Sequence, residues 1–119
     1  TDTSAARQKT VMGSIGGSEE AWFALVVRDE GINGNPTVTA TVDDPSLEVL
    51  LDYECMTKPN YSTCATGEAD ADHETACRAL RSVSLDTSCS STTESGTAFI
   101  RVRSTDRACH TYALTVTVE

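Results

Sequence analysis

The feature that most constrains the fold of this chain is a strict alternation of apolar and polar residues in several short runs. "TVTATV" at 37–42 places two valines and an alanine on one side and three threonines on the other. "SLEVLLDY" at 46–53 and "YALTVTV" at 112–118 have the same period of two. Successive side chains of a β-strand point to opposite faces, so each run predicts a strand with one buried face.

Further runs of this kind punctuate the rest of the chain, and no window repeats apolar residues at helical spacing over three turns. The expected strands are 10–15, 21–27, 37–42, 46–53, 81–86, 95–103 and 112–118. Turn-forming stretches such as "GGSEE", "DEGINGNP", "DDPS" and "TESG" separate them. This pattern predicts an all-β fold, an antiparallel β-sandwich or jelly roll of about seven to eight strands, formed by one domain over residues 1–119.

Two segments do not fit the strand pattern. Residues 55–81 are polar and contain Cys55, Cys64 and Cys77, so we expect one long loop held by disulfides. Within it, "TACRALR" is compatible with a short helical turn. Residues 1–8 are expected to be a flexible N-terminal segment or one that contacts a partner.

The charge of the chain excludes two classes of partner. Its 119 residues carry a formal charge of −9 at pH 7, which repels nucleic-acid phosphates and anionic lipid headgroups. No apolar run approaches the roughly 20 residues that a membrane helix needs. We therefore expect neither nucleic-acid binding nor membrane insertion.

Five cysteines in so short a chain, none of them in a CxxC pair, indicate disulfides in an oxidising compartment rather than a zinc site. We expect secretion to the cell exterior or surface. If strands simply alternate in direction, Cys55, Cys64, Cys77 and Cys109 lie at one end of the sandwich and allow three pairings. We favour Cys55–Cys64 with Cys77–Cys109, which leaves Cys89 as the free thiol.

The acidic stretch "GEADADHE" is a candidate calcium site, because alternating carboxylates supply the oxygen ligands that Ca²⁺ prefers. Its candidate ligands are Glu68, Asp70, Asp72 and Glu74. The stretch lacks the frame of an EF-hand, and an acidic solvated loop is the alternative reading. No other cofactor is expected.

Catalytic motifs are not evident. The histidines are His73 and His110, and no serine lies in a Gly-x-Ser-x-Gly elbow. His110 follows Cys109 at an expected turn, where an exposed imidazole is the common case. We therefore do not expect an enzyme.

The order of these motifs resembles the bacterial pre-peptidase C-terminal domain, a jelly-roll-like module of exported proteins. The resemblance is carried by "VMGSIGGSEEAWFALVV", "SLEVLL", "SGTAFIRV" and "YALTVTV". The insert at 55–81 departs from the family pattern, as does "SLEVLL", where the family has an Asp-Leu-Asp-Leu strand. The resemblance implies a non-catalytic accessory module of a secreted or cell-surface bacterial protein.

Two functions follow as expectations. The first is a module that binds an extracellular protein or polysaccharide surface, with Trp22 and Phe99 as candidate contact residues. The second is a structural subunit of a fibre or surface layer, in which copies of the chain join through strands or a disulfide.

Overall fold

The structure is a computed structural model that describes residues 7–27, 37–55, 60–71, 75–89 and 96–118. Each described element is a β-strand, and no helix among these residues is long and apolar enough to cross a bilayer. The strands are β1 (Arg7–Ile15), β2 (Glu20–Val27), β3 (Thr37–Val42), β4 (Leu47–Cys55), β5 (Asn60–Cys64), β6 (Glu68–Ala69), β7 (Cys77–Leu80), β8 (Ser82–Cys89), β9 (Gly96–Ser104) and β10 (His110–Val118).

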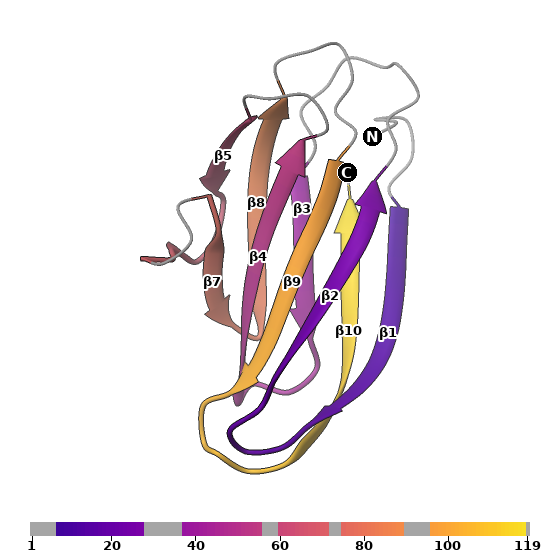
Figure 1. Ribbon diagram of the computed structural model, residues 1–119, viewed down its shortest axis with the longest axis vertical. Helices are drawn as coiled ribbons and strands as arrows, with labels where there is room; N and C mark the ends of the chain where they lie inside the picture. The colour runs from indigo at the N-terminus through magenta and orange to yellow at the C-terminus, as the bar shows by residue number, and fades with distance from the viewer. Residues whose placement is uncertain (1–6, 28–36, 56–59, 72–74, 90–95, 119) are drawn as a thin grey trace.

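The strands form two five-stranded antiparallel sheets that pack face to face (Figure 1). One sheet has the order β1-β10-β3-β8-β5 and the other the order β2-β9-β4-β7-β6. The predicted β-sandwich is therefore confirmed, and so is each of the seven predicted strands.

The expected long loop is where prediction and structure differ. Residues 55–81 contain β5, β6 and β7, so the sandwich has ten described strands rather than seven to eight. The short helical turn that the sequence "TACRALR" would allow is not formed. Instead, β7 pairs with β4 from Leu51↔Cys77 to Glu48↔Leu80. That ladder satisfies the backbone groups which a single helical turn would leave without partners.

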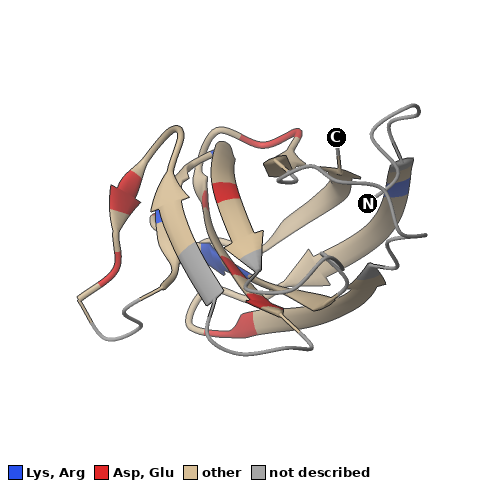
Figure 2. Ribbon diagram, turned by 90° about the horizontal axis from the view of Figure 1, so that it is seen from above, with Lys and Arg blue, Asp and Glu red and all other residues tan. Residues whose placement is uncertain are grey.

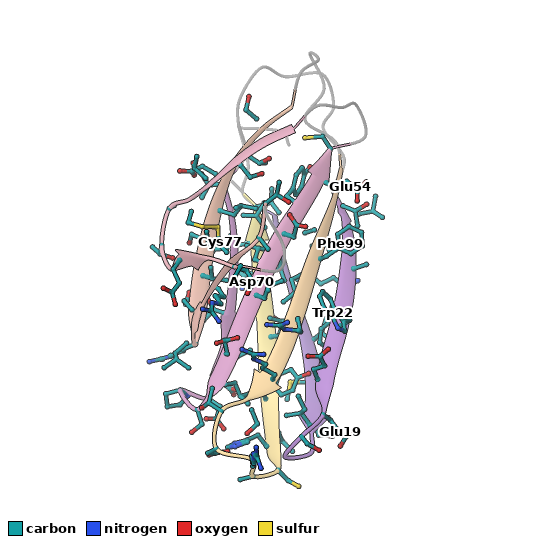
Figure 3. All side chains as sticks on the ribbon, turned by 60° about the vertical axis from the view of Figure 1, so that its left-hand side comes forward. Glu19, Trp22, Glu54, Asp70, Cys77 and Phe99 are labelled. Atoms are coloured by element: carbon teal, nitrogen blue, oxygen red, sulfur yellow. A yellow bond between two sulfur atoms is a disulfide. The ribbon has the colours of Figure 1, made fainter. Side chains whose placement is uncertain are left out.

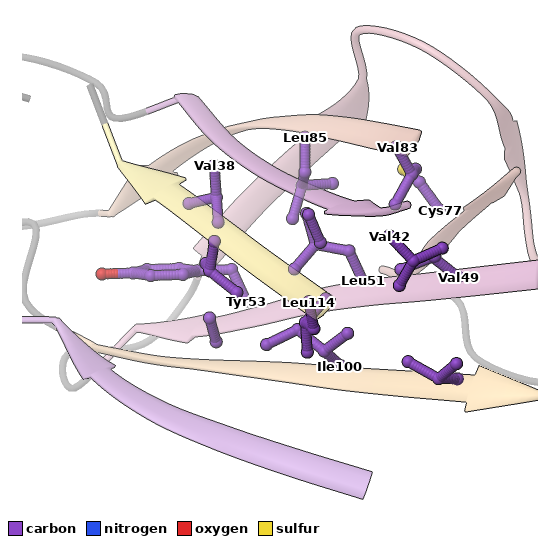
Figure 4. Packing of buried hydrophobic residues seen from close by; sticks show 14 of the residues in the cluster. Val38, Val42, Val49, Leu51, Tyr53, Cys77, Val83, Leu85, Ile100 and Leu114 are labelled. Atoms are coloured by element: carbon purple, nitrogen blue, oxygen red, sulfur yellow. The ribbon is translucent and has the colours of Figure 1, made fainter. Parts of the chain in front are cut away.

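The core lies between the sheets and consists of the apolar sets that alternate along the strands (Figure 4). On β4 the inward residues Leu47, Val49, Leu51 and Tyr53 are at most 1% exposed, as their spacing predicts. The other fully covered large side chains include Val38, Val42, Val83, Leu85, Ile100 and Leu114. The outward residues of the same strands are thereby left on the two surfaces of the sandwich.

The disulfide that the structure describes contradicts the predicted pairing of the cysteines. Cys64 on β5 bonds to Cys77 on β7, with their Cα atoms 5.7 Å apart, so the bridge joins the two sheets. Cys55–Cys64 and Cys77–Cys109 are therefore wrong. The predicted sorting failed because β5, β6 and β7 intervene between β4 and β8, so these two strands run in the same direction (Figure 1). Cys55 and Cys109 consequently lie at opposite ends of the sandwich.

Of the remaining cysteines, Cys109 differs from expectation. Cys55 takes part in a disulfide, whereas Cys109 is a free, exposed thiol. Cys109 lies in the β9–β10 loop and takes no part in the bridge that joins β5 to β7. The side chain of Cys89, the predicted free thiol, lies outside the described part of the structure.

Candidate binding face

The outer surface of the β2–β9–β4 sheet combines aromatic, apolar and charged side chains, and we call it the Trp22 face. Its residues are fixed by the strand registers, which place Trp22 opposite Arg101 and Ala24 opposite Phe99. The face consists of Glu20, Trp22, Ala24 and Val26 of β2, Thr97, Phe99, Arg101 and Arg103 of β9, and Glu48, Leu50, Asp52 and Glu54 of β4.

The two candidate contact residues lie together on this face. Trp22 and Phe99 occupy diagonal positions on neighbouring strands, and their side chains point to the same side of the sheet (Figure 3). Trp22 is 48% exposed, and Phe99 is partly buried. Val26, which is 63% exposed, extends the apolar surface along β2. The next residue of β2, Phe23, points inward against the core, as strand alternation requires.

Arg101 points outward from β9 and lies at the centre of the Trp22 face, where neighbouring side chains cover it. Its guanidinium carbon lies 5.9 Å from the centroid of the Trp22 ring, which is within the range of a cation–π contact. Its Nη2 lies 3.4 Å from Oε1 of Glu48, and its Nε lies 3.9 Å from Oε2 of Glu20. Arg101 is only 7% exposed, so its charge is largely covered by these neighbours.

The carboxylates around Arg101 also fix the neighbouring side chains. Nη2 of Arg103 lies 2.8 Å from Oε1 of Glu48, so Glu48 contacts two arginines. The indole N–H of Trp22 donates to Oε1 of Glu20 over 3.4 Å. Trp22 therefore contacts a cation on the neighbouring strand and a carboxylate of its own strand, while about half of its side chain stays exposed.

The charges that face water on this surface are mainly acidic. Glu20 and Glu54 are exposed, whereas Arg101 is buried and Arg103 is partly buried. The whole chain has twice as many acidic as basic residues, 18 against 9, and Asp and Glu appear on strands and loops around the sandwich (Figure 2). The Trp22 face is thus an aromatic centre with an acidic rim.

A second polar cluster lies at the end of the sandwich that carries the β9–β10 loop. Nδ1 of His110 lies 2.6 Å from Oδ2 of Asp44, and its Nε2 lies 2.8 Å from Oδ1 of Asp106. The His110 side chain is 12% exposed, so the predicted exposed imidazole is wrong. The ring connects the β3–β4 turn to the β9–β10 loop.

The carboxylates change the titration of this cluster. The hydrogen bond with Asp106, followed by the one with Asp44, raises the pKa of His110 above its ordinary value. The pKa of Asp44 is lowered chiefly by the backbone N–H of Ser46, and that of Asp106 chiefly by His110. Sequence spacing gave no signal for this cluster, because Asp44 lies 66 residues from His110 and meets it only through the fold, whereas Asp106 lies four residues from His110.

The calcium candidates are only partly described. Glu68 and Asp70 lie 3.6 and 3.8 Å from nitrogen atoms of Arg78, which thus supplies a cation to both carboxylates. Asp72 and Glu74 lie outside the described residues. Within the described ranges, no three His, Cys, Asp or Glu side chains group closely enough to hold a metal ion. The calcium site stays a prediction, which the melting temperature in Ca²⁺ would test.

Comparison with known proteins gives a likeness of fold. No family model matches the chain, and no curated protein matches it. Among solved structures, it resembles the crystal structure of Aeromonas hydrophila PliG, a periplasmic lysozyme inhibitor of g-type lysozyme. The TM-score is 0.52 at 14% identity, over 100% of this chain and 92% of that one. The resemblance to the pre-peptidase C-terminal domain stays a prediction. What the comparison shows is that the fold of this chain is similar to the fold of this inhibitor.

Proposed function

We propose that this chain is a non-catalytic protein-binding module of the periplasm or cell exterior, and that it covers a basic region of a partner protein with the Trp22 face. The observation that carries the proposal is the contact between Trp22 and Arg101, which places an exposed aromatic ring over a covered cation on a surface with exposed carboxylates. A g-type lysozyme is the first partner to test, because the similar sandwich of known activity is an inhibitor of that enzyme.

The composition of the face supports a protein partner. Tryptophan and arginine are the residues most enriched at the energetic centres of protein interfaces, where each contributes about 2 kcal/mol or more. Trp22 offers a large, half-exposed apolar ring, and Phe99 lies diagonally beside it. A partner side chain that packs on both rings removes apolar area from water.

Charge supports a basic partner. At −9, the chain attracts cationic proteins and speeds their encounter, especially at low ionic strength. Glu20 at the rim of the face is exposed and places a carboxylate where lysine or arginine side chains of such a partner can reach it. A lysine or arginine can also stack on Trp22 from the solvent side.

The disulfides support the proposed compartment. The Cys64–Cys77 bridge and the bridged Cys55 persist where the thiol pool is oxidising, as in the periplasm or outside the cell. The periplasmic inhibitor with a similar fold is consistent with that location.

Calorimetric titration with a g-type lysozyme, together with its lytic activity, tests the proposal. We expect a complex that weakens as salt is added, and we expect Trp22→Ala to weaken it by about tenfold or more. Met12→Ala is the matched control, because Met12 is 75% exposed on β1 of the opposite sheet. If the lysozyme does not bind, it is not the partner. If Met12→Ala weakens the complex as much as Trp22→Ala, the Trp22 face is not the contact.

A further inference from the structure

The two long sides of the sandwich are built differently. On one side the edge strands are β5, with five residues, and β6, with two, and the Cys64–Cys77 bridge joins the sheets there. On the other side the edge strands are β1 and β2, with nine and eight residues, one at the edge of each sheet (Figure 1). Short edge strands discourage pairing with other chains, whereas long ones invite it.

The β2 strand has the properties of an edge that pairs. Within the described ranges its ladder runs to β9 and to no second strand. Its sequence is "EAWFALVV", in which Glu20 at the start is the single charged residue. Proteins usually protect an exposed edge with lysine, proline, a bulge or an inward charge, and β2 has none of these devices between Ala21 and Val27.

Beside β2, the two sheets leave an apolar gap of about 90 Å³. Its apolar walls come from both sheets and are formed by Val11, Phe23, Leu25, Ile100, Leu114 and Val116. A dry apolar cavity of about 150 Å³ admits benzene, so this smaller gap suits one branched aliphatic side chain. Lys9 also lines the gap, which disfavours a basic side chain there and favours an apolar one.

We propose that the outer edge of β2, which pairs with no second strand among the described residues, receives an extended segment of a basic partner protein as an added strand. Alternate side chains of that segment point in opposite directions. The apolar set enters the gap between the sheets, and the basic set lies over the Trp22 face beside Glu20. This inference rests on the proposed function for the existence of a basic partner, and it names the segment by which that partner is held.

The charges near β2 favour such a segment over a second copy of this chain as the occupant of the edge. A β2 strand from another copy would bring a second Glu20 and a second charge of −9 to the contact. A lysine or arginine at the same place pairs with Glu20 and lies near the ring of Trp22. The acidic surface therefore favours a basic segment over self-association.

The direct test uses a short blocked peptide that alternates lysine and valine, added to the whole chain. Trp22 is the single tryptophan, so its fluorescence reports binding at the edge. We expect alternate amides of β2 to gain protection from hydrogen exchange, since every second N–H of an edge strand points away from its sheet. Amides of the central strand β4 are expected to keep their exchange rates.

Two control peptides separate strand addition from simple attraction. Methylation of alternate amides removes the donors that pair with β2, and replacement of lysine by glutamate reverses the charge. We expect both changes to abolish the added protection. Equal protection by the methylated peptide would overturn the inference, as would protection that appears at β5 instead of β2. Peptide-independent self-association through β2 would identify a second copy as the occupant and would also overturn it.

A variant of the chain gives a second route. Leu25→Lys places a charge at the gap and is expected to weaken peptide binding by about tenfold or more. Thr63→Lys makes the same change of charge on the exposed surface of β5 and serves as its control. If Leu25→Lys does not fold, the methylated peptide still decides the question with the unaltered chain.

The outcomes distinguish this inference from the proposed function. If Trp22→Ala weakens a lysozyme complex while the exchange of β2 amides is unchanged by the lysozyme, the Trp22 face stands and strand addition fails. If the alternating peptide protects β2 and the lysozyme does not bind, strand addition stands and the lysozyme is not the partner.

Discussion

Nδ1 of His110 lies 2.6 Å from Oδ2 of Asp44, across 66 residues of sequence, and the opposite ring nitrogen contacts Asp106. Both nitrogens can donate to carboxylates only when the imidazole is protonated. The charged ring therefore ties the β3–β4 turn to the β9–β10 loop, and the strength of this connection depends on pH.

The raised pKa of His110 predicts a loss of stability in alkaline solution. Its contribution is complete below the ordinary histidine pKa of 6.5 and is lost as pH rises through the raised pKa of the folded state. The lowered pKa values of Asp44 and Asp106 act in the opposite direction, because their contribution is present above 3.8 and is lost in acid. The cluster thus stabilises the fold most between pH 3.8 and pH 6.5.

Urea unfolding at a series of pH values measures this effect. We expect the free energy of unfolding to fall as pH rises above 6.5, and we expect His110→Gln to remove much of that slope. His73→Gln changes the other histidine and controls for a general effect of histidine loss. An unchanged slope in His110→Gln would show that the cluster does not contribute.

The Cys64–Cys77 bridge is predicted to stabilise the sandwich by about 2 to 4 kcal/mol, because it closes a short loop in the unfolded chain. Replacement of both cysteines by serine should lower the urea midpoint accordingly. Cys109→Ser alters a free thiol and should change the free energy of unfolding by less than about 0.5 kcal/mol. Equal effects of the two changes would argue against a stabilising bridge.

Gly13 is predicted to be required for the packing of Tyr112. A Cβ atom at this position would lie 2.6 Å from the hydroxyl oxygen and from Cζ of Tyr112, whose side chain is buried in the core. Gly13→Ala should therefore cost about 1 to 3 kcal/mol of stability. Ser14→Ala, at an exposed position of the same strand, is its control. Adding Tyr112→Phe should recover part of the loss, and no loss at all would contradict the predicted contact.

The exposed thiol of Cys109 bears on the alternative of an assembled subunit. Because Cys109 is free, mild oxidation should join two chains into a dimer that is visible on a non-reducing gel. Cys109→Ser should remove that band. A native chain that is monomeric in solution both with and without reductant would count against assembly through this cysteine.

Alternation along the chain was sufficient to place seven strands and their buried faces. The inward row of β4 shows why: Val49 and Leu51 are separated by one outward residue, and that period is a property of neighbouring positions. The same reasoning placed Trp22 and Phe23 on opposite faces of one strand, whereas the register of β2 with β9 put Trp22 on the same surface as Phe99.

Other features depended on how distant strands meet. The sequences "NYSTC" and "CRAL" carry little alternation, yet β5 and β7 form because β8 and β4 offer them ladder partners. Their insertion changes the direction of β8 and with it the choice of disulfide partners. Pairing of cysteines could not be predicted without those strands.

The sequence by itself determined a disulfide-bearing β-sandwich with an excess of acidic residues, because composition and a period of two are local properties of the chain. Only the tertiary structure decided that Arg101 is covered by Trp22, that His110 joins Asp44 and that β2 lies at an edge. Each of these depends on strand order and register, which bring together residues far apart in sequence and are set by packing of the whole sandwich rather than by any single segment.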